Sequence, residues 1–203
     1  MHFEKRIPMI LELGFREEAL PMLKAYVNFL WSSNEDLNLI SRKMGFEDLV
    51  DNHIIDCLLP LKLFPTGLKN VADFGSGGGM PGVIYALQFP EATFHLYEKS
   101  HLKQDFLNLC KKITPNIQIH GDIPLVLNNI DLIMARGFKP IDVILDMSRG
   151  YYRAKGKYFL LKGRREKIDE EIALAQKKFK DLEARVEILK SPALEVERHL
   201  VLI

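Results

Sequence analysis

The residues best suited to chemistry lie in one glycine-rich stretch, DFGSGGGMPG, which spans residues 73–82. Glycine occupies five of the eight positions from 75 to 82. A glycine can adopt a positive φ angle, and it leaves no side chain between the backbone and a bound molecule. One or two glycines would be enough for a tight turn, so five of them predict a loop that binds a nucleotide-like ligand. The loop residues expected to contact that ligand are Gly75, Ser76, Gly77 and Gly79.

Two kinds of nucleotide-like ligand compete for this loop. Gly77, Gly79 and Gly82 spell the GxGxxG pattern of dinucleotide sites, and Glu98 follows at about the distance of a ribose-binding acid. Asp73, however, stands two residues before the first glycine and gives the pattern D-x-G-x-G-x-G. A carboxylate there would repel a pyrophosphate, whereas S-adenosylmethionine has no phosphate and carries a positive sulfonium and ammonium. Asp73 therefore favours S-adenosylmethionine, and an NAD-dependent oxidoreductase is the alternative.

Residues after two neighbouring strands could complete the ligand site. Glu98 follows the second predicted strand and could accept hydrogen bonds from both ribose hydroxyls; its alternative role is a surface ion pair with Lys99. Asp122 and Ile123 follow the third predicted strand. Asp122 could accept from the exocyclic amine of adenine and Ile123 could pack on its face, although a plain turn would account for both residues.

S-adenosylmethionine donates a methyl group, and the distribution of charge indicates what kind of molecule accepts it. The whole chain has a net charge of only +1, so any preference must come from local charge. Residues 136–167 contain ten Lys and Arg residues but only three Asp and Glu residues. Polarised charge beside a ligand crevice favours a polyanion such as nucleic acid, and a small-molecule acceptor is the alternative. A solvated basic helix face would explain Arg149 and Arg153, but not the cations at predicted strand ends. The candidate phosphate contacts are Lys139, Lys162, Arg164 and Arg165.

The segment after the fourth predicted strand, where the chain reads ARGFKP (residues 135–140), helps to choose among the atoms that could receive the methyl group. Enzymes that methylate the exocyclic amine of adenine commonly carry an Asn/Asp-Pro-Pro-aromatic element at this place. Cytosine C5 methylation needs a cysteine nucleophile on an exposed loop, whereas Cys57 and Cys110 lie in helical patterns. A ring nitrogen such as guanine N7 has a free lone pair and no proton, so transfer needs alignment rather than a general base.

These residues must be positioned by the elements around them, and the period of the apolar residues changes near residue 65. Up to that point the period is helical, as in residues 18–33 and 46–64. Beyond it, short strand-like runs alternate with helical runs, which is typical of βαβ units and a mostly parallel sheet. Two closing strand candidates, residues 185–191 and 198–203, have no helix between them and predict an antiparallel hairpin at the sheet edge.

We therefore predict an α/β fold in two parts, with a turn at Pro65-Thr66-Gly67 between them. Residues 1–65 form an N-terminal helical extension, and residues 66–203 form a Rossmann-like sheet domain. The first strand of that domain leads into the glycine loop, and the ends of the next strands carry the other candidate residues. Open α/β sheets bind their ligands at these carboxyl ends.

No metal ion or membrane is indicated as a partner. The two cysteines show no CxxC spacing and no nearby histidine cluster, which argues against zinc. No apolar run approaches the about 18 residues of a membrane span, and the start MHFEKRIPM lacks the apolar core of a secretory signal. We expect a cytoplasmic protein that holds no metal and acts as a monomer.

An ordered set of motifs resembles one known family. In chain order the motifs are NLIS (residues 38–41), DNHIIDCLLPL, DFGSGGGMPG, MARG, LLKG and ERHLVLI, and together they span nearly the whole chain. This set is similar to that of the glucose-inhibited division protein B family, bacterial methyltransferases that modify guanosine N7 in small-subunit ribosomal RNA. The resemblance implies a class I methyltransferase fold, S-adenosylmethionine as the methyl donor and the 530-loop region of 16S rRNA as the acceptor.

The resemblance also implies roles for individual residues. Gly75 and Met80 match loop residues that touch the cofactor, and Glu98 stands where the family usually has Asp. Arg136 matches the arginine after the fourth strand, a contact to the cofactor and the active site, and is the candidate catalytic residue. Lys162 matches the lysine of the LKG element.

Other positions are less closely tied to the family pattern. The segment Gly121-Asp122-Ile123 departs from an Arg-Ala-Glu-like run of the family, and Arg198 is a further expected RNA contact. His53 and Asp56 recur in the family, but their spacing of three places them on one helix face, where a hydrogen bond gives a structural reason for both. Phe138 could stack on a base or pack in the core.

Overall fold

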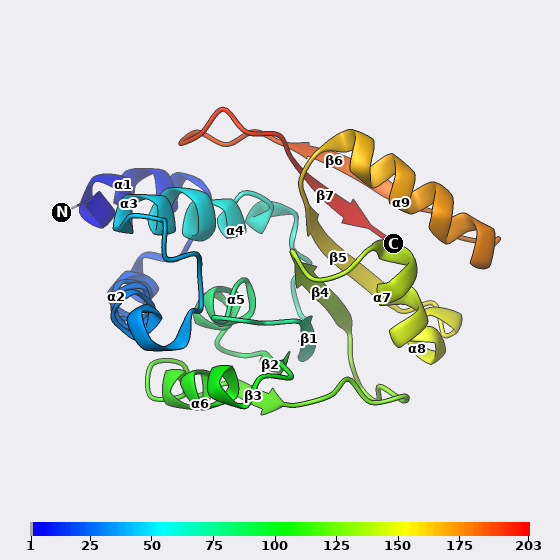
Figure 1. Cartoon of the computed structure of the whole chain (residues 1–203), viewed down its shortest axis with the longest axis horizontal. Helices are drawn as coiled ribbons and strands as arrows, with labels where there is room; N and C mark the ends of the chain where they lie inside the picture. Colours follow the sequence, from blue (N-terminus) through cyan, green and yellow to red (C-terminus); the bar gives the residue numbers. More distant parts are fainter. Residues whose placement is uncertain (1) are drawn as a thin grey trace.

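The computed structural model, which describes residues 2–203, is built around a seven-stranded sheet with the strand order β3-β2-β1-β4-β5-β7-β6 (Figure 1). The first five strands run parallel to one another. Their short apolar runs suit strands that are buried on both faces. They are β1 (Asn70–Phe74), β2 (Thr93–Tyr97), β3 (Ile117–His120), β4 (Leu132–Arg136) and β5 (Lys157–Lys162).

The last two strands close the sheet in the opposite sense. β7 (Arg198–Leu202) pairs antiparallel with both β5 and β6 (Arg185–Leu189). β7 therefore lies inside the sheet, where Leu200 and Val201 are fully buried, whereas β6 forms the edge and exposes Ile188. The predicted α/β class and the antiparallel C-terminal hairpin are confirmed.

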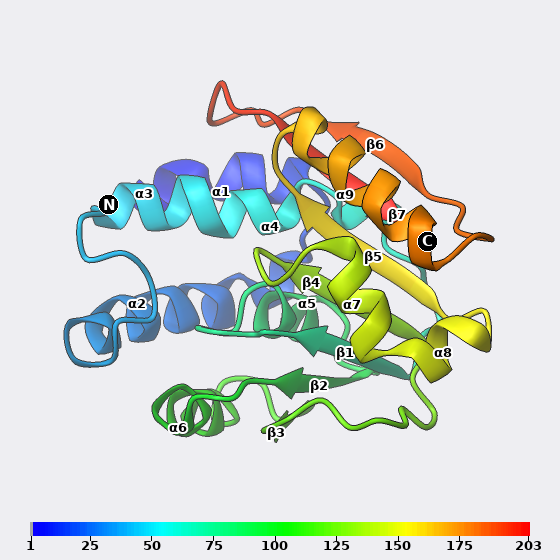
Figure 2. The same ribbon diagram turned by 45° about the vertical axis from the view of Figure 1, so that its right-hand side comes forward.

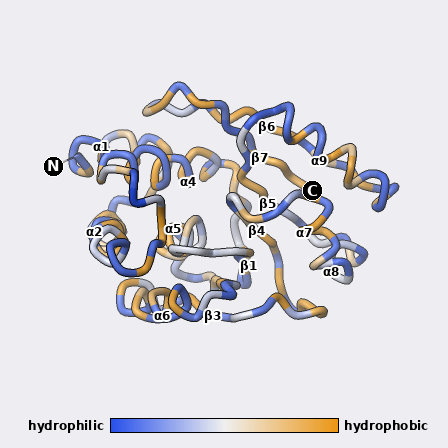
Figure 3. The backbone as a smooth tube through the Cα atoms, in the orientation of Figure 1, coloured by the Kyte–Doolittle hydropathy of each residue, from blue (hydrophilic) through white to orange (hydrophobic). Residues whose placement is uncertain are grey.

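Helices cover both faces of the sheet (Figure 1, Figure 2). One face packs against α1, α2, α5, α6 and the helical run of residues 46–58, and the other packs against α7, α8 and α9. Hydrophobic and hydrophilic residues alternate along these helices, as expected when one side is buried (Figure 3). None of the helices within residues 2–203 is long and apolar enough to cross a membrane. Their bounds are α1 (His2–Glu12), α2 (Leu20–Leu37), α5 (Gly82–Gln88), α6 (His101–Cys110), α7 (Ile141–Met147), α8 (Arg149–Arg153) and α9 (Arg165–Lys178), with short 3-10 turns at Glu17–Ala19 and Leu61–Leu63.

The helical run of residues 46–58 is not a uniform α-helix. α3 (Phe46–Leu49) passes into a π-helical stretch (Val50–Ile55), which is followed by α4 (Asp56–Leu58). A π turn holds one more residue than an α turn, and such turns occur frequently at functional sites. His53 lies within the stretch and Asp56 follows it, so the wide turn governs where these two side chains point. The apolar period predicted the helix but not this widening.

The residues that follow β4 form two helices, α7 and α8, rather than one. Ser148 has a φ of −120° and a ψ of 34°, which separates α7 from α8. Its hydroxyl lies 2.8 Å from both the Ile144 carbonyl and the Tyr158 hydroxyl. A serine side chain that bonds to the backbone competes with helical hydrogen bonds, which explains the break.

The N-terminal helices and the sheet share one hydrophobic core. The Phe64 ring centroid lies 4.8 Å from that of Tyr85, 4.9 Å from that of Phe89 and 5.2 Å from that of Phe159. Phe64 thus joins the end of the helical part to α5 and β5. The division of the chain at residue 65 stays a prediction, and the packing makes the preceding helices one of the layers over the sheet.

Replacing Phe64 by alanine should lower the free energy of unfolding by about 3–5 kcal/mol, because the change leaves a cavity where the rings meet. Unfolding in urea should remain a single transition, since both parts share the core. Leu63→Ala is the matched control: Leu63 is 44% exposed, and its replacement should change the free energy of unfolding by less than about 0.5 kcal/mol. Two separate transitions in the wild-type protein, or equal effects of the two substitutions, would contradict this packing.

Candidate active site

The glycine loop connects β1 to α5 at the carboxyl edge of the sheet. Gly75, Gly77 and Gly79 have φ angles of 72°, 57° and 93°, in the left-handed region that residues with a Cβ rarely adopt. The amides of Gly75 and Ser76 donate to the Tyr97 carbonyl at 2.9 and 3.1 Å, which fixes the loop to the end of β2. A Cβ at Gly77 would meet no atom closer than 3.9 Å, so the backbone there faces open space.

Asp73 lies beneath the loop rather than in front of it. Its side chain is fully buried, and its Oδ2 atom accepts a hydrogen bond of 3.1 Å from the Gly82 amide at the start of α5. Its Oδ1 atom is buried without a hydrogen-bond partner in residues 2–203. Burial raises the pKa of Asp73 to about 7, because the charged form loses its water. The carboxylate holds the loop against α5, and its direct contact with a ligand stays a prediction.

Helix α2 forms the floor of the same loop. The Tyr26 hydroxyl donates a hydrogen bond of 2.6 Å to the Gly78 carbonyl, and a Cβ at Gly78 would lie 2.9 Å from Leu30. Met80 is buried in the core shared by α2 and the sheet. The N-terminal helices therefore help to shape the loop, and the contact predicted between Met80 and the cofactor stays a prediction.

Glu98 lies next to the loop at the end of β2. Its Oε2 atom accepts a hydrogen bond of 3.0 Å from the Gly77 amide, and its Oε1 atom accepts one of 2.8 Å from the Ser100 amide. Each carboxylate oxygen has a second lone pair, so Glu98 has the capacity to accept from a ligand hydroxyl as well. Lys99 pairs instead with Asp122, at 3.1 Å on the surface. The alternative role considered for Glu98, an ion pair with Lys99, is not the arrangement in the structure.

The segment after β3 carries the two predicted adenine contacts. Ile123 is half-buried against the core that includes α7, α8 and α9, whereas Asp122 is exposed and pairs with Lys99. Among the described residues, no hydrogen bond joins either of them to the glycine loop. Their adenine contacts stay a prediction.

Phe138 connects the glycine loop to a cavity at the ends of β4 and β5. Its ring packs so closely on Gly75 that a Cβ there would overlap the ring. The same side chain is half-buried and lines the cavity. Position 75 therefore requires glycine, and Phe138 belongs to the wall between the loop and the cavity.

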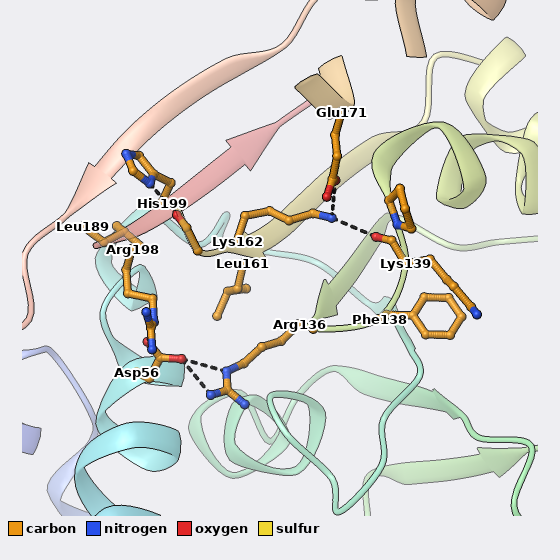
Figure 4. Close-up of a pocket in the computed structure, with 13 residues that line it drawn as sticks. Asp56, Arg136, Phe138, Lys139, Leu161, Lys162, Glu171, Leu189, Arg198 and His199 are labelled. Atoms are coloured by element: carbon orange, nitrogen blue, oxygen red, sulfur yellow. Dashed lines mark hydrogen bonds and ion pairs between the residues drawn. The ribbon is translucent and has the colours of Figure 1, made fainter. Parts of the chain in front are cut away.

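The cavity has a volume of about 460 Å³ and is bordered by the loops after β4 and β5 and by the start of β7 (Figure 4). Four of the predicted cations line it, together with two buried acids. The cations are Arg136, Lys139, Lys162 and Arg198, and the acids are Asp56 and Glu171. A cavity with this excess of positive charge suits an anionic ligand.

Arg136 is directed at the N-terminal helical run rather than at the glycine loop. Its Nε atom lies 2.9 Å from Asp56 Oδ2, and one terminal nitrogen lies 2.7 Å from the same oxygen. That terminal nitrogen also donates to the Asn52 carbonyl at 3.0 Å, and the other lies 3.2 Å from His53 Nδ1. Arg136 thus ties β4 to the helical run, and its predicted catalytic role stays a prediction.

His53 and Asp56 act together in holding arginines. The same helix face was expected for both, but their shared partner, Arg136, could not be read from their spacing. Burial and the neighbouring Arg136 lower the pKa of His53 to about 4, so its ring is neutral at pH 7 and Nδ1 can accept a hydrogen bond. Asp56 also accepts a hydrogen bond of 2.5 Å from Arg198 Nε through its second oxygen.

Lys162 holds the loop that carries Phe138. Its Nζ atom donates to Glu171 Oε2 at 2.7 Å and to the Lys139 carbonyl at 2.8 Å. Glu171 Oε2 also accepts from the Ile141 amide at 3.1 Å. Sequence reasoning missed Glu171, because it is one of several acids along α9 and only its buried position distinguishes it.

The predicted RNA-binding cations fall into two groups. Lys162 and Arg198 are held by buried carboxylates, whereas Lys139, Arg164 and Arg165 are exposed, and of these three Lys139 lines the cavity. Arg165 pairs with Asp169 at 2.8 Å. Within residues 2–203 no ion pair engages Lys139 or Arg164, so their charges are available to a large anion.

Within residues 2–203 the structure shows no cluster of metal-binding groups. Among the described residues, no group of three or more His, Cys, Asp or Glu side chains is arranged to hold a metal ion. Cys57 and Cys110 are buried free thiols, and burial raises the pKa of each to about 12. Neither thiol is suited to act as a nucleophile.

Relatives in sequence share most of the chain. Residues 19–201 match the family described as rRNA small subunit methyltransferase G. A Bdellovibrio bacteriovorus protein named ribosomal RNA small subunit methyltransferase G 1 is 68% identical over 202 residues, which cover 100% of this chain and 98% of that protein. A Brachyspira hyodysenteriae protein named ribosomal RNA small subunit methyltransferase G is 32% identical over 181 residues, which cover 88% and 87%.

Solved structures with low sequence identity share the fold. A precorrin-6y C5,15-methyltransferase from Geobacter metallireducens superposes with a TM-score of 0.52 at 14% identity, covering 72% of this chain and 85% of that one. The N-terminal domain of human METTL16 in complex with SAH superposes with a TM-score of 0.52 at 10% identity, covering 84% and 77%. The predicted class I methyltransferase fold is confirmed.

Replacing Asp73 by asparagine should remove part of the pH dependence of stability. An aspartate in the unfolded chain has a pKa of about 4, whereas Asp73 in the fold has a pKa of about 7. The folded state therefore keeps a proton that the unfolded state has lost, and the contribution of Asp73 to stability falls as the pH rises from about 4 to about 7. The asparagine oxygen can still accept from the Gly82 amide but cannot titrate.

Urea denaturation at about pH 5 and about pH 7.5 should show a smaller loss of stability in Asp73→Asn than in the wild type. Asp131→Asn is the matched control, because Asp131 is an exposed acid that accepts from the Lys69 and Asn70 amides at the other end of β1. An identical loss of stability in Asp73→Asn and in the wild type would show that the buried carboxyl does not titrate in this range.

Proposed function

Because the chain belongs to the rRNA small subunit methyltransferase G family, we propose that it transfers a methyl group from S-adenosylmethionine to N7 of a guanosine in the 530-loop region of 16S rRNA. The family resemblance predicted from the ordered motifs is confirmed, and with it the class of enzyme, a methyltransferase. What we propose beyond the family is the identity of the methyl donor, of the modified nucleotide and of the modified atom.

The glycine loop and Glu98 fit S-adenosylmethionine. The open space over Gly77 leaves the backbone free to approach a ligand, and Glu98 has unused lone pairs beside it for ribose hydroxyls. Within residues 2–203 the buried Oδ1 atom of Asp73 has no hydrogen-bond partner, and a free acceptor under the loop suits a cationic ligand above it. When bound there, the donor supplies a methyl group on a positively charged sulfur.

The cavity beside the loop fits the RNA. Phe138 forms the wall between the two, so a base that enters from the cavity side arrives next to the glycine loop. Two exposed cations, Lys139 in the cavity lining and Arg164 next to the lining residue Gly163, are candidates for contacts to backbone phosphates. The positive cavity is the observation that favours a polyanion over the small-molecule acceptor considered as the alternative.

Guanine N7 suits the groups that the chain offers. This atom has an in-plane lone pair and no proton to remove, so its reaction needs alignment rather than a general base. His53 is neutral, but its Nδ1 accepts from Arg136 and is already engaged. In the proposed reaction Arg136 shapes the acceptor side of the pocket from β4. We further propose that the protein acts as a cytoplasmic monomer, without a metal ion.

Incubation of the protein with labelled donor and small ribosomal subunits, followed by mapping of the modified nucleotide, should reveal one methylated guanosine with the label at N7.

Glu98→Ala should weaken binding of the demethylated donor by about tenfold or more, because the ribose hydroxyls lose their charged acceptor. Label on a small molecule only, or binding of NADH in place of the sulfonium ligand, would contradict the proposal.

The double variant Lys139→Gln/Arg164→Gln should bind small-subunit RNA more weakly and with less salt dependence. Loss of two phosphate contacts should reduce the slope of log affinity against log salt by about 1.5. Lys69→Gln is the matched control, because Lys69 is exposed just before β1, at the end of the strand that lies away from the glycine loop. A double variant with the wild-type salt slope would remove these two residues from the RNA contact.

A further inference from the structure

We propose that Asp56 is a positioning residue for RNA binding: it holds the guanidinium groups of Arg136 and Arg198 together, so that Arg198 presents its remaining N–H groups to a backbone phosphate. This inference rests on the proposed function, because the phosphate belongs to the RNA acceptor of that reaction.

The two guanidinium groups bind opposite oxygens of one carboxylate (Figure 4). Arg136 Nε lies 2.9 Å from Asp56 Oδ2, and Arg198 Nε lies 2.5 Å from Asp56 Oδ1. The two arginines stand on β4 and β7, which are not neighbours in the sheet because β5 lies between them. The carboxylate on α4 is therefore the direct link between the two cations.

The carboxylate of Asp56 also reduces the repulsion between the two positive charges of Arg136 and Arg198. Two guanidinium groups close together in a partly buried site repel each other. One carboxylate offsets that repulsion and leaves one net positive charge at the cavity wall. The side chains of Asp56, Arg136 and Arg198 are 9%, 18% and 28% exposed, so solvent screens the three charges only in part.

The two arginines differ in what they can still bind. Arg136 uses its terminal nitrogens on Asp56, the Asn52 carbonyl and His53. Arg198 donates, within residues 2–203, only to Asp56 and to the Glu197 carbonyl. It is also the more exposed of the two and lines the cavity. Its planar group therefore retains N–H donors that match the geometry of a phosphate.

Asp51 offers a matched control in the same helical run. Its carboxylate binds Arg6 at 2.8 and 2.7 Å and lies 3.0 Å from His2 Nε2. Its side chain is 12% exposed, close to the 9% of Asp56, but it does not line the cavity. Asp51→Asn therefore removes a similar ion pair and the same charge without touching Arg136 or Arg198.

The first test observes the arginines directly. In ¹H–¹⁵N spectra of the protein without RNA, Asp56→Asn should shift the Nε–H signals of both Arg136 and Arg198 and speed their exchange with water. Asp51→Asn should change the Arg6 signal and leave those two unchanged. Unchanged Arg136 and Arg198 signals in Asp56→Asn would overturn the proposal.

The second test is binding of small-subunit RNA, and the sign of the effect is diagnostic. Both substitutions remove one negative charge, so charge alone predicts slightly tighter binding for both. Positioning predicts that Asp56→Asn binds about tenfold more weakly, whereas Asp51→Asn does not. Equal or tighter binding by Asp56→Asn, or an equal loss in Asp51→Asn, would overturn the proposal.

A third variant keeps the inference testable if Asp56→Asn does not fold. Arg198→Lys keeps the positive charge and leaves the pair between Asp56 and Arg136 intact, but it loses the planar fork. It should bind RNA several-fold more weakly, and wild-type affinity would overturn the proposal. None of these tests requires turnover, so failure to methylate guanosine N7 would contradict the proposed reaction and leave the result on Asp56 separate.

Discussion

A single buried carboxylate, that of Asp56, joins the N-terminal helical layer to two strands at the carboxyl edge of the sheet. Arg136 and Arg198 come from strands that are not adjacent, and both bind this group. Because a buried charge is tolerated only when it is paired, the three side chains constrain one another. The N-terminal helical layer, β4 and β7 are thereby fixed at one point. The same constraint explains why Arg136, at the end of β4, faces the helical run rather than the glycine loop.

Carboxylates also hold the glycine loop and the loop that borders the cavity. At the glycine loop, Asp73 accepts a hydrogen bond from the Gly82 amide and Glu98 accepts one from the Gly77 amide. At the cavity, Glu171 binds Lys162 and the Ile141 amide, which fixes the loop that carries Phe138. Charged groups bonded to backbone amides make strong, directional contacts. The glycine loop can thus be both free of side chains and held in one shape.

The fold could be predicted almost completely from the sequence, whereas the contacts within the site could not. Alternating strand and helix periods, such as those around Asp73 and Glu98, report local burial, and the right order of elements follows from them. The ion pairs of Asp56 could not be predicted in this way. Its partners Arg136 and Arg198 lie 80 and 142 residues away, and only the folded chain brings the three residues together. Lys162 was predicted as a phosphate contact, but its partner Glu171 is only one of several acids along α9, and the fold alone shows that this acid holds Lys162 at the cavity.

The decisive experiment is a crystal structure of the protein with S-adenosylhomocysteine, the demethylated donor. We expect the ligand to lie over Gly77, where the backbone faces open space, with Glu98 at its ribose, while Asp56 still bridges Arg136 and Arg198. A ligand bound away from the glycine loop, or an Asp56 carboxylate that no longer joins Arg136 to Arg198, would contradict the roles assigned to these residues.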